Sequence, residues 1–115
     1  MTSAVTDTAQ LAENDVRRGL PRFSTLNLPH NLRELEKLQA IAGNQGVTTG
    51  QLALAWLKAQ GGDVIPIPGS RFIAHMRKNL AAEDPRLDAA TLERLNALLT
   101  PDQVAGARYS EALQA

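Results

Sequence analysis

One short segment of the sequence combines the groups that bind an anion. A β-branched stretch at 64–68 leads through a Gly-Ser turn into a predicted helix, and the candidate ligand-binding side chains of the segment are Ser70, Arg71, His75, Lys78 and Asn79. The start of a helix presents free backbone N–H groups and the positive end of its dipole, which favour a phosphate. Taken alone, these residues fit a capped helix with solvated basic side chains slightly better than a ligand site.

Other chemistries are poorly represented in the sequence. Cysteine is absent, which excludes thiolate nucleophiles, thiolate metal sites and disulfide bonds. The only histidines, His30 and His75, lie too far apart in the chain to suggest a zinc ligand set. Neither a G-x-S-x-G nor a G-x-G-x-x-G motif occurs. The residues therefore predict no catalytic group and no metal site.

The composition is that of a globular domain, and it lacks the excess of basic residues typical of a nucleic-acid-binding protein. The chain has 115 residues, 43% of them hydrophobic and 21% charged. Twelve basic and twelve acidic side chains give a formal net charge of zero, so no nucleic-acid partner is predicted. The longest apolar run, 52–57, is far below the roughly 18 residues of a membrane span, and the N-terminus lacks the pattern of a secretory signal. We therefore expect no membrane partner and a cytoplasmic location.

The apolar pattern predicts two helices in the first half of the chain. Residues 1–29 show no sustained period and are predicted to be loop, partly disordered. From Leu28 onward, apolar residues recur at helical spacing until glycines at 43 and 46. The next helix opens with a capping box formed by Thr48 and Gln51.

A strand and two further helices are predicted in the second half. The β-branched stretch 64–68 predicts a short strand, although its prolines remove backbone donors. Ser70 and Asp88 are the predicted N-caps of the two following helices, and the last helix ends before Pro101. A strand needs a neighbour to bond to. Either the segment borrows a partner strand, or it is not a strand in this chain.

The first two predicted helices superficially match a helix-turn-helix, the DNA-binding motif. A recognition helix needs an exposed polar face, whereas residues 52–57 are apolar on nearly every side. Together with the zero net charge, this argues against DNA recognition.

Several runs together resemble the C-terminal third of an aldo-keto reductase, most closely the perakine-reductase-like branch. The resemblance is carried by VTTGQLALAWL at 47–57, VIPIPGS at 64–70 and Asn-Leu at 79–80. It extends back through DVRR at 15–18 and LPRF at 20–23, and forward to VAGARY at 104–109. Nearly the whole chain is covered, and the joint spacing of the runs is specific.

The resemblance implies a fold, a cofactor and binding residues. Aldo-keto reductases are (β/α)₈ barrels that bind NADP(H) without a Rossmann motif and reduce aldehydes and ketones. In the family, the loop and helix after the eighth strand hold the adenosine 2′-phosphate and the adenine. The matching positions here are Gly69, Ser70 and Arg71 in the phosphate-binding turn, His75 where the family often has Arg, Lys78 where it often has Glu, and Asn79 at its adenine-contacting Asn.

The resemblance also implies what the chain does not carry. The family's catalytic Asp, Tyr, Lys and His belong to the first two-thirds of the barrel, and Tyr109 lies in the wrong region to replace that tyrosine. Closing a whole (β/α)₈ barrel takes about 250 residues. We therefore expect the α/β class: a mostly α-helical barrel fragment, comprising the last helix–strand–helix unit and the C-terminal helix. The fragment would occupy residues 30–115, with the NADP-binding segment at 64–80.

The sequence thus predicts a fragment of an NADP(H)-dependent oxidoreductase that has a 2′-phosphate-binding segment and no catalytic tetrad. We expect the isolated chain to be inactive and its affinity for NADP(H) to be weak or absent. Apolar faces left exposed by the missing strands predict self-association. The alternative is a non-catalytic helical module that binds a nucleotide or another protein.

Overall fold

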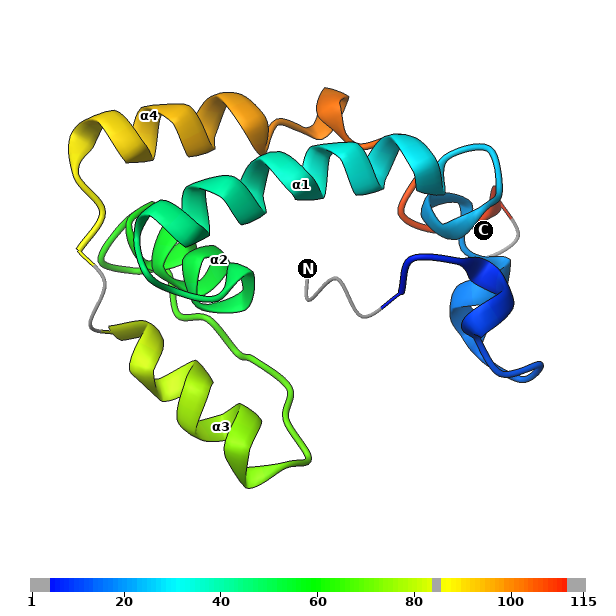
Figure 1. The fold of residues 1–115 in the computed structure, drawn as a ribbon, viewed down its shortest axis with the longest axis horizontal. Helices are drawn as coiled ribbons and strands as arrows, with labels where there is room; N and C mark the ends of the chain where they lie inside the picture. The colour runs from blue at the N-terminus through cyan, green and yellow to red at the C-terminus, as the bar shows by residue number, and fades with distance from the viewer. Residues whose placement is uncertain (1–4, 84–85, 112–115) are drawn as a thin grey trace. The chain divides into compact units, whose positions relative to one another are not determined.

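The computed structural model describes residues 5–83 and 86–111. The described chain divides into two compact units. We call residues 38–83 and 86–98 the helical unit, and residues 5–37 with 99–111 the loop unit. The α-helices are α1 (Leu28–Asn44), α2 (Thr49–Lys58), α3 (Ile73–Leu80) and α4 (Ala89–Leu98) (Figure 1). The 3₁₀ helices are η1 (Thr8–Gln10), η2 (Val16–Gly19), η3 (Pro21–Phe23), η4 (Ala81–Glu83) and η5 (Pro101–Gln103).

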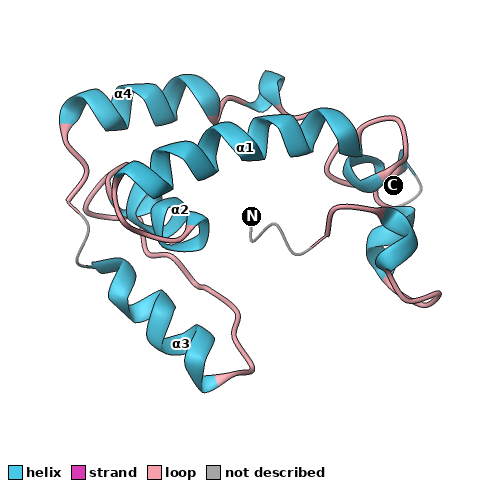
Figure 2. Ribbon diagram, in the orientation of Figure 1, coloured by secondary structure: helices cyan, strands magenta, loops and turns pink. Residues whose placement is uncertain are grey.

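The described residues contain no β-strand, as Figure 2 shows. The predicted strand at 64–68 is part of a stretch, 64–70, that has no helix, turn or ladder. It forms no strand because the described chain supplies no second strand to pair with it. No helix among the described residues is long and apolar enough to cross a membrane.

α2 begins where the capping box predicted it. The Thr48 hydroxyl accepts a hydrogen bond from the Gln51 N–H at 3.3 Å, and the Gln51 side-chain oxygen accepts one from the Thr48 N–H at 3.0 Å. These two bonds satisfy donors that a helix start leaves open. Only Leu52 and Ala55 of α2 are buried, so the helix is less enclosed than its apolar sequence suggested.

The core of the helical unit lies between α1, α2 and α4. Leu52 and Leu95 are its most completely buried side chains, at 1% and 0% exposure. α4 starts at the predicted cap, because the Asp88 carboxylate accepts a hydrogen bond from the Thr91 N–H at 2.7 Å. The other buried apolar residues of this unit are Leu38, Ile41, Ala42, Ala55 and Ala82.

Side-chain hydrogen bonds fix α4 within the helical unit. The Trp56 indole N–H donates to the Asn96 side-chain oxygen at 2.7 Å, which links α2 to α4. The Gln45 amide donates to the Thr91 hydroxyl at 3.3 Å. Polar groups at the edge of a small core are satisfied in this way without opening the core to water.

The loop unit is held by hydrogen bonds between distant parts of the sequence. The Asn31 amide donates to the carbonyl oxygens of Arg22 and Ala105, and its oxygen accepts from the Ala105 N–H at 2.8 Å. Gly106 has φ +87°, and a Cβ there would lie 2.9 Å from the Pro21 carbonyl oxygen. That position requires glycine on both counts. Of the predicted loop 1–29, residues 1–4 lie outside the described residues, and η1, η2 and η3 occupy part of the remainder.

Candidate functional site

The site predicted from the sequence borders a cavity in the helical unit. The cavity has a volume of about 380 Å³. It lies among the end of α2, the 64–70 segment and α3, and its lining is mainly apolar. The lining residues are Leu54, Lys58, Val64, Ile65, Pro66, Pro68, Ser70, Met76, Asn79, Leu80 and Ala82.

Ser70 and Asn79 are the predicted site residues that line this cavity. Asn79 is half-buried, and it is the least exposed of the predicted set. Its amide offers both donors and an acceptor, a combination that suits the edge of a base. The structure therefore brings a hydroxyl and an amide to one apolar cavity.

Ser70 does not cap α3, contrary to the sequence prediction. The N-cap is Phe72, at φ −118° and ψ 133°, and it makes no side-chain capping bond. The Ser70 hydroxyl donates instead to the Phe72 carbonyl oxygen at 3.0 Å. The first hydrogen bond of the helix runs from the Met76 N–H to the same carbonyl oxygen. The N–H groups of the first turn of α3 are thus left without a side-chain cap.

Arg71 and His75 both contact the aromatic ring of Phe72. The Arg71 guanidinium carbon lies 5.3 Å from the centroid of the Phe72 ring. The His75 ring contacts the same ring edge-on, with centroids 5.3 Å apart and planes at 80°. A cation over an aromatic face is favoured electrostatically. Arg71 and His75 are exposed, so their polar atoms remain accessible to a ligand.

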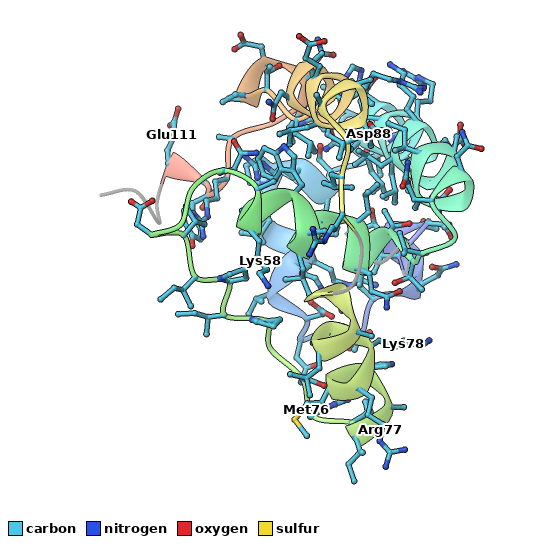
Figure 3. All side chains as sticks on the ribbon, turned by 90° about the vertical axis from the view of Figure 1, so that its left-hand side faces the viewer. Lys58, Met76, Arg77, Lys78, Asp88 and Glu111 are labelled. Carbon is cyan, nitrogen blue, oxygen red and sulfur yellow. The ribbon has the colours of Figure 1, made fainter. Side chains whose placement is uncertain are left out.

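Lys78 lies away from the cavity. Figure 3 shows its side chain on the opposite side of α3 from Met76, which lines the cavity. Two residues along a helix correspond to a rotation of about 200°, so the two side chains must diverge. Arg77 and Lys78 are in the last turn of α3, where basic side chains favour the negative end of the helix dipole. Lys78 is thus not among the residues that line this cavity.

Lys58, which is not in the set predicted from the sequence, is a basic residue that lines the cavity. It lies in the last turn of α2, and its side chain lines the cavity with Ser70 and Asn79 (Figure 3). A signal existed in the sequence: Lys58 follows Leu54 by four residues, and both therefore face the same way from the helix. The cavity wall thus carries one cation on α2 and two neutral polar groups from the following segments.

Gly69 is not required by the fold. A Cβ at this position would meet nothing within 4 Å, and its φ is not in the left-handed region. α3 and Arg71 carry basic side chains and no acidic one. The described residues contain no group of three or more His, Cys, Asp or Glu residues that could hold a metal ion.

A family model for the aldo/keto reductase family matches residues 2–100, which is most of the chain. The chain belongs to the aldo/keto reductase family. It is also 37% identical over 109 residues to aldo-keto reductase yakc of Schizosaccharomyces pombe, a protein whose name carries the designation NADP(+). The match covers 95% of this chain and 32% of the yeast protein. No solved structure matches the chain.

The family assignment agrees with the sequence prediction and explains the fold. Membership of the aldo/keto reductase family implies a TIM barrel, a fold of about 250 residues. The four α-helices seen here are consistent with part of such a barrel. This aldo/keto reductase chain spans about a third of the length of the curated relative that it matches.

Proposed function

We propose that this chain is the cofactor-binding portion of an NADP(H)-dependent carbonyl or alcohol oxidoreductase. In this proposal it corresponds to the last helix–strand–helix unit of the barrel and the C-terminal helix, and the segment 64–80 holds the adenosine end of NADP(H). The observation that carries the proposal is the junction of an uncapped helix start with a cavity lined by Ser70 and Asn79.

The chemistry of the donor set fits the 2′-phosphate. Ser70 and Arg71 would hold the phosphate, with the N–H groups at the start of α3. His75 would add a second donor beside the Phe72 ring. Gly69 would allow close approach of the phosphate, which accounts for a glycine that the fold itself does not need. Lys78 belonged to the set predicted from the sequence, but its position on α3 makes Lys58 the better candidate for the remaining cation.

The cavity fits only part of a dinucleotide. Its volume of about 380 Å³ is near the lower end of the roughly 300–1,000 Å³ typical of small-molecule pockets. Asn79 would contact the adenine, and the apolar wall formed by Leu54, Met76 and Leu80 would pack against the base. The nicotinamide, which supplies the hydride chemistry when the cofactor is bound, would lie outside this cavity. No residue of the chain is assigned a catalytic role in the proposal.

Isothermal titration calorimetry of the chain with NADPH and with NADH tests the proposal. We expect any binding by the isolated chain to be weak, and a surviving 2′-phosphate site to show itself as saturable binding that is tighter for NADPH. Arg71 is exposed, so its contact with the phosphate is worth about 1 kcal/mol at most. Arg71→Ala should therefore weaken NADPH binding by up to about fivefold and leave NADH binding unchanged. Arg77→Ala, which removes the same charge from α3, the helix that follows Arg71, is the matched control and should change neither affinity.

A second pair of variants compares the two lysines. Lys58→Ala should weaken NADPH binding more than Lys78→Ala, because Lys58 alone of the two lines the cavity. Equal affinity for NADPH and NADH would refute a 2′-phosphate site. The absence of any binding would favour the alternative, a helical module for protein interaction.

The proposal also predicts that the chain alone does not turn over substrate. NADPH oxidation with a panel of aldehydes should remain at background. Turnover that Arg71→Ala abolishes would show that catalytic groups had been missed.

A further inference from the structure

His75 is the one histidine of the helical unit, and the other histidine of the chain, His30, belongs to the loop unit. An imidazole ordinarily changes its charge near pH 6.5, so small changes in its surroundings alter that charge at physiological pH. The His30 ring binds the Gln103 carbonyl oxygen at 3.0 Å. In the described structure neither ring nitrogen of His75 has such a partner, and the side chain is exposed. His75 can therefore bind both a proton and a ligand.

His75 stands in the first turn of α3, next to the cation that the proposed function assigns to the 2′-phosphate. Its ring and the Arg71 guanidinium both contact the ring of Phe72, which is the N-cap of the helix. Phe72 is thus a common neighbour that places both side chains at the start of α3. The N–H groups that have no helical partner lie at the same end of the helix. An anion bound there would lie next to all three kinds of donor.

The charges around His75 are mainly positive. α3 packs chiefly against α2 and η4, and the connection 59–72 precedes it. The charged residues of these elements and of α3 are Lys58, Asp63, Arg71, Arg77, Lys78 and Glu83. Both acidic residues are eight or more positions from His75 in the chain, whereas the basic ones include its neighbours on α3. Without an anion, a positive charge on His75 would add to Arg71 and to the positive end of the helix dipole.

Given the 2′-phosphate site proposed above, on which this inference rests, we propose that His75 takes up a proton when NADP(H) binds. The chain then prefers NADP(H) over NAD(H) more strongly as the pH falls. The proton comes from the solvent and binds the imidazole nitrogen that carries none, and no covalent bond of the nucleotide changes. The sign follows from linkage, because an opposite charge nearby favours the protonated imidazole, and protonation strengthens phosphate binding by the same factor.

The size of the effect is limited by the exposure of His75. An ion pair between an exposed imidazolium and a phosphate changes affinity by up to about fivefold. A fivefold change equals a shift of about 0.7 pH unit in the titration midpoint of the imidazole. The phosphate itself takes up a proton near pH 6, which opposes the effect in acid. Affinities are therefore compared between variants at one pH, so that the titration of the phosphate cancels.

NMR titration of the two imidazole rings tests the inference directly. The chain is titrated alone, with saturating NADP⁺ and with saturating NAD⁺, across the pH range in which imidazole changes its charge. We expect NADP⁺ to raise the midpoint of His75 by up to about 0.7 pH unit and NAD⁺ to leave it unchanged. His30 is the internal control, because it belongs to the loop unit and its midpoint should move with neither nucleotide. A His75 midpoint that both nucleotides move equally, or that neither moves, would overturn the inference.

Two variants of His75 give an independent measurement by calorimetry. His75 is exposed, so its replacement should not disturb the fold. Relative to His75→Asn, which cannot titrate, the unchanged chain should gain up to about threefold in its preference for NADP⁺ over NAD⁺ between about pH 8.5 and about pH 6.5. His75→Arg keeps its charge throughout this range, so its preference should exceed that of His75→Asn by the same factor at both pH values.

The outcomes separate this inference from the proposed function. A preference for NADP⁺ that changes with pH equally in the unchanged chain and in His75→Asn would overturn the role of His75 and leave the 2′-phosphate site standing. Equal affinity for NADP⁺ and NAD⁺, or no binding of either nucleotide, would overturn the 2′-phosphate site and this inference with it.

Discussion

Replacing Leu95 by alanine tests the core that positions the cavity. Leu95 has no exposed surface, and it lies on α4 one residue before Asn96, which binds the Trp56 indole at 2.7 Å. Buried Leu→Ala replacements cost about 2–5 kcal/mol, depending on how far the surroundings collapse into the cavity. The hydrogen bond between Asn96 and Trp56 holds α4 against α2 and restricts that collapse. We therefore expect a loss of about 3 kcal/mol.

That loss is large for a unit of this size. The helical unit has about 60 residues, and proteins are typically stable by 0.05–0.15 kcal/mol per residue, which gives about 3–9 kcal/mol. Leu95→Ala would therefore remove a third or more of the unit's free energy of unfolding. Leu80→Ala is the matched control, because Leu80 is 65% exposed on α3 of the same unit. Its replacement should change stability by no more than about 0.5 kcal/mol.

Urea unfolding followed by tryptophan fluorescence measures both variants. Trp56 is the only tryptophan of the chain and belongs to the helical unit, so its emission reports on that unit alone. The midpoint of Leu95→Ala should fall by roughly 1–3 M relative to the unchanged chain. Equal midpoints for Leu95→Ala and Leu80→Ala would refute the packing of α4 against α2 described above.

Two further predictions concern helix starts in the same unit. Thr48→Ala removes the hydroxyl that accepts a hydrogen bond from the Gln51 N–H, and it should lower the free energy of unfolding by about 1 kcal/mol. Thr48→Ser keeps a hydroxyl and should retain most of that stabilisation. Urea unfolding midpoints measure both effects. Hydrogen bonds from the Thr91 backbone and side chain hold the pKa of Asp88 below its ordinary value of 3.8. The charged cap should therefore stabilise the unit fully above pH 3.8, and this stabilisation should be lost as the pH falls through the lowered pKa. Thermal melts should show that loss in the unchanged chain and no such additional loss in Asp88→Asn. An equal loss of stability in both proteins would contradict this role of Asp88.

The helix starts could be predicted from the sequence because they depend on local chemistry. Thr48 and Asp88 cap the helices that follow them, since each side chain needs only a backbone N–H three residues ahead. α1 follows the apolar stripe from Leu28 as predicted. A capping residue and the helix that follows it lie within a few residues of each other, so their interaction does not depend on the rest of the fold.

The failures came where the decisive partner is distant or missing. Ser70 has the right residue type for a cap, but the chain extends past it and the helix begins only after Phe72. The β-branched stretch 64–68 has the propensity of a strand, but a strand exists only with a neighbour. Lys58 was not in the predicted set, because the value of a basic side chain at the end of α2 depends on the cavity beside it. Each of these differences concerns tertiary context rather than local preference.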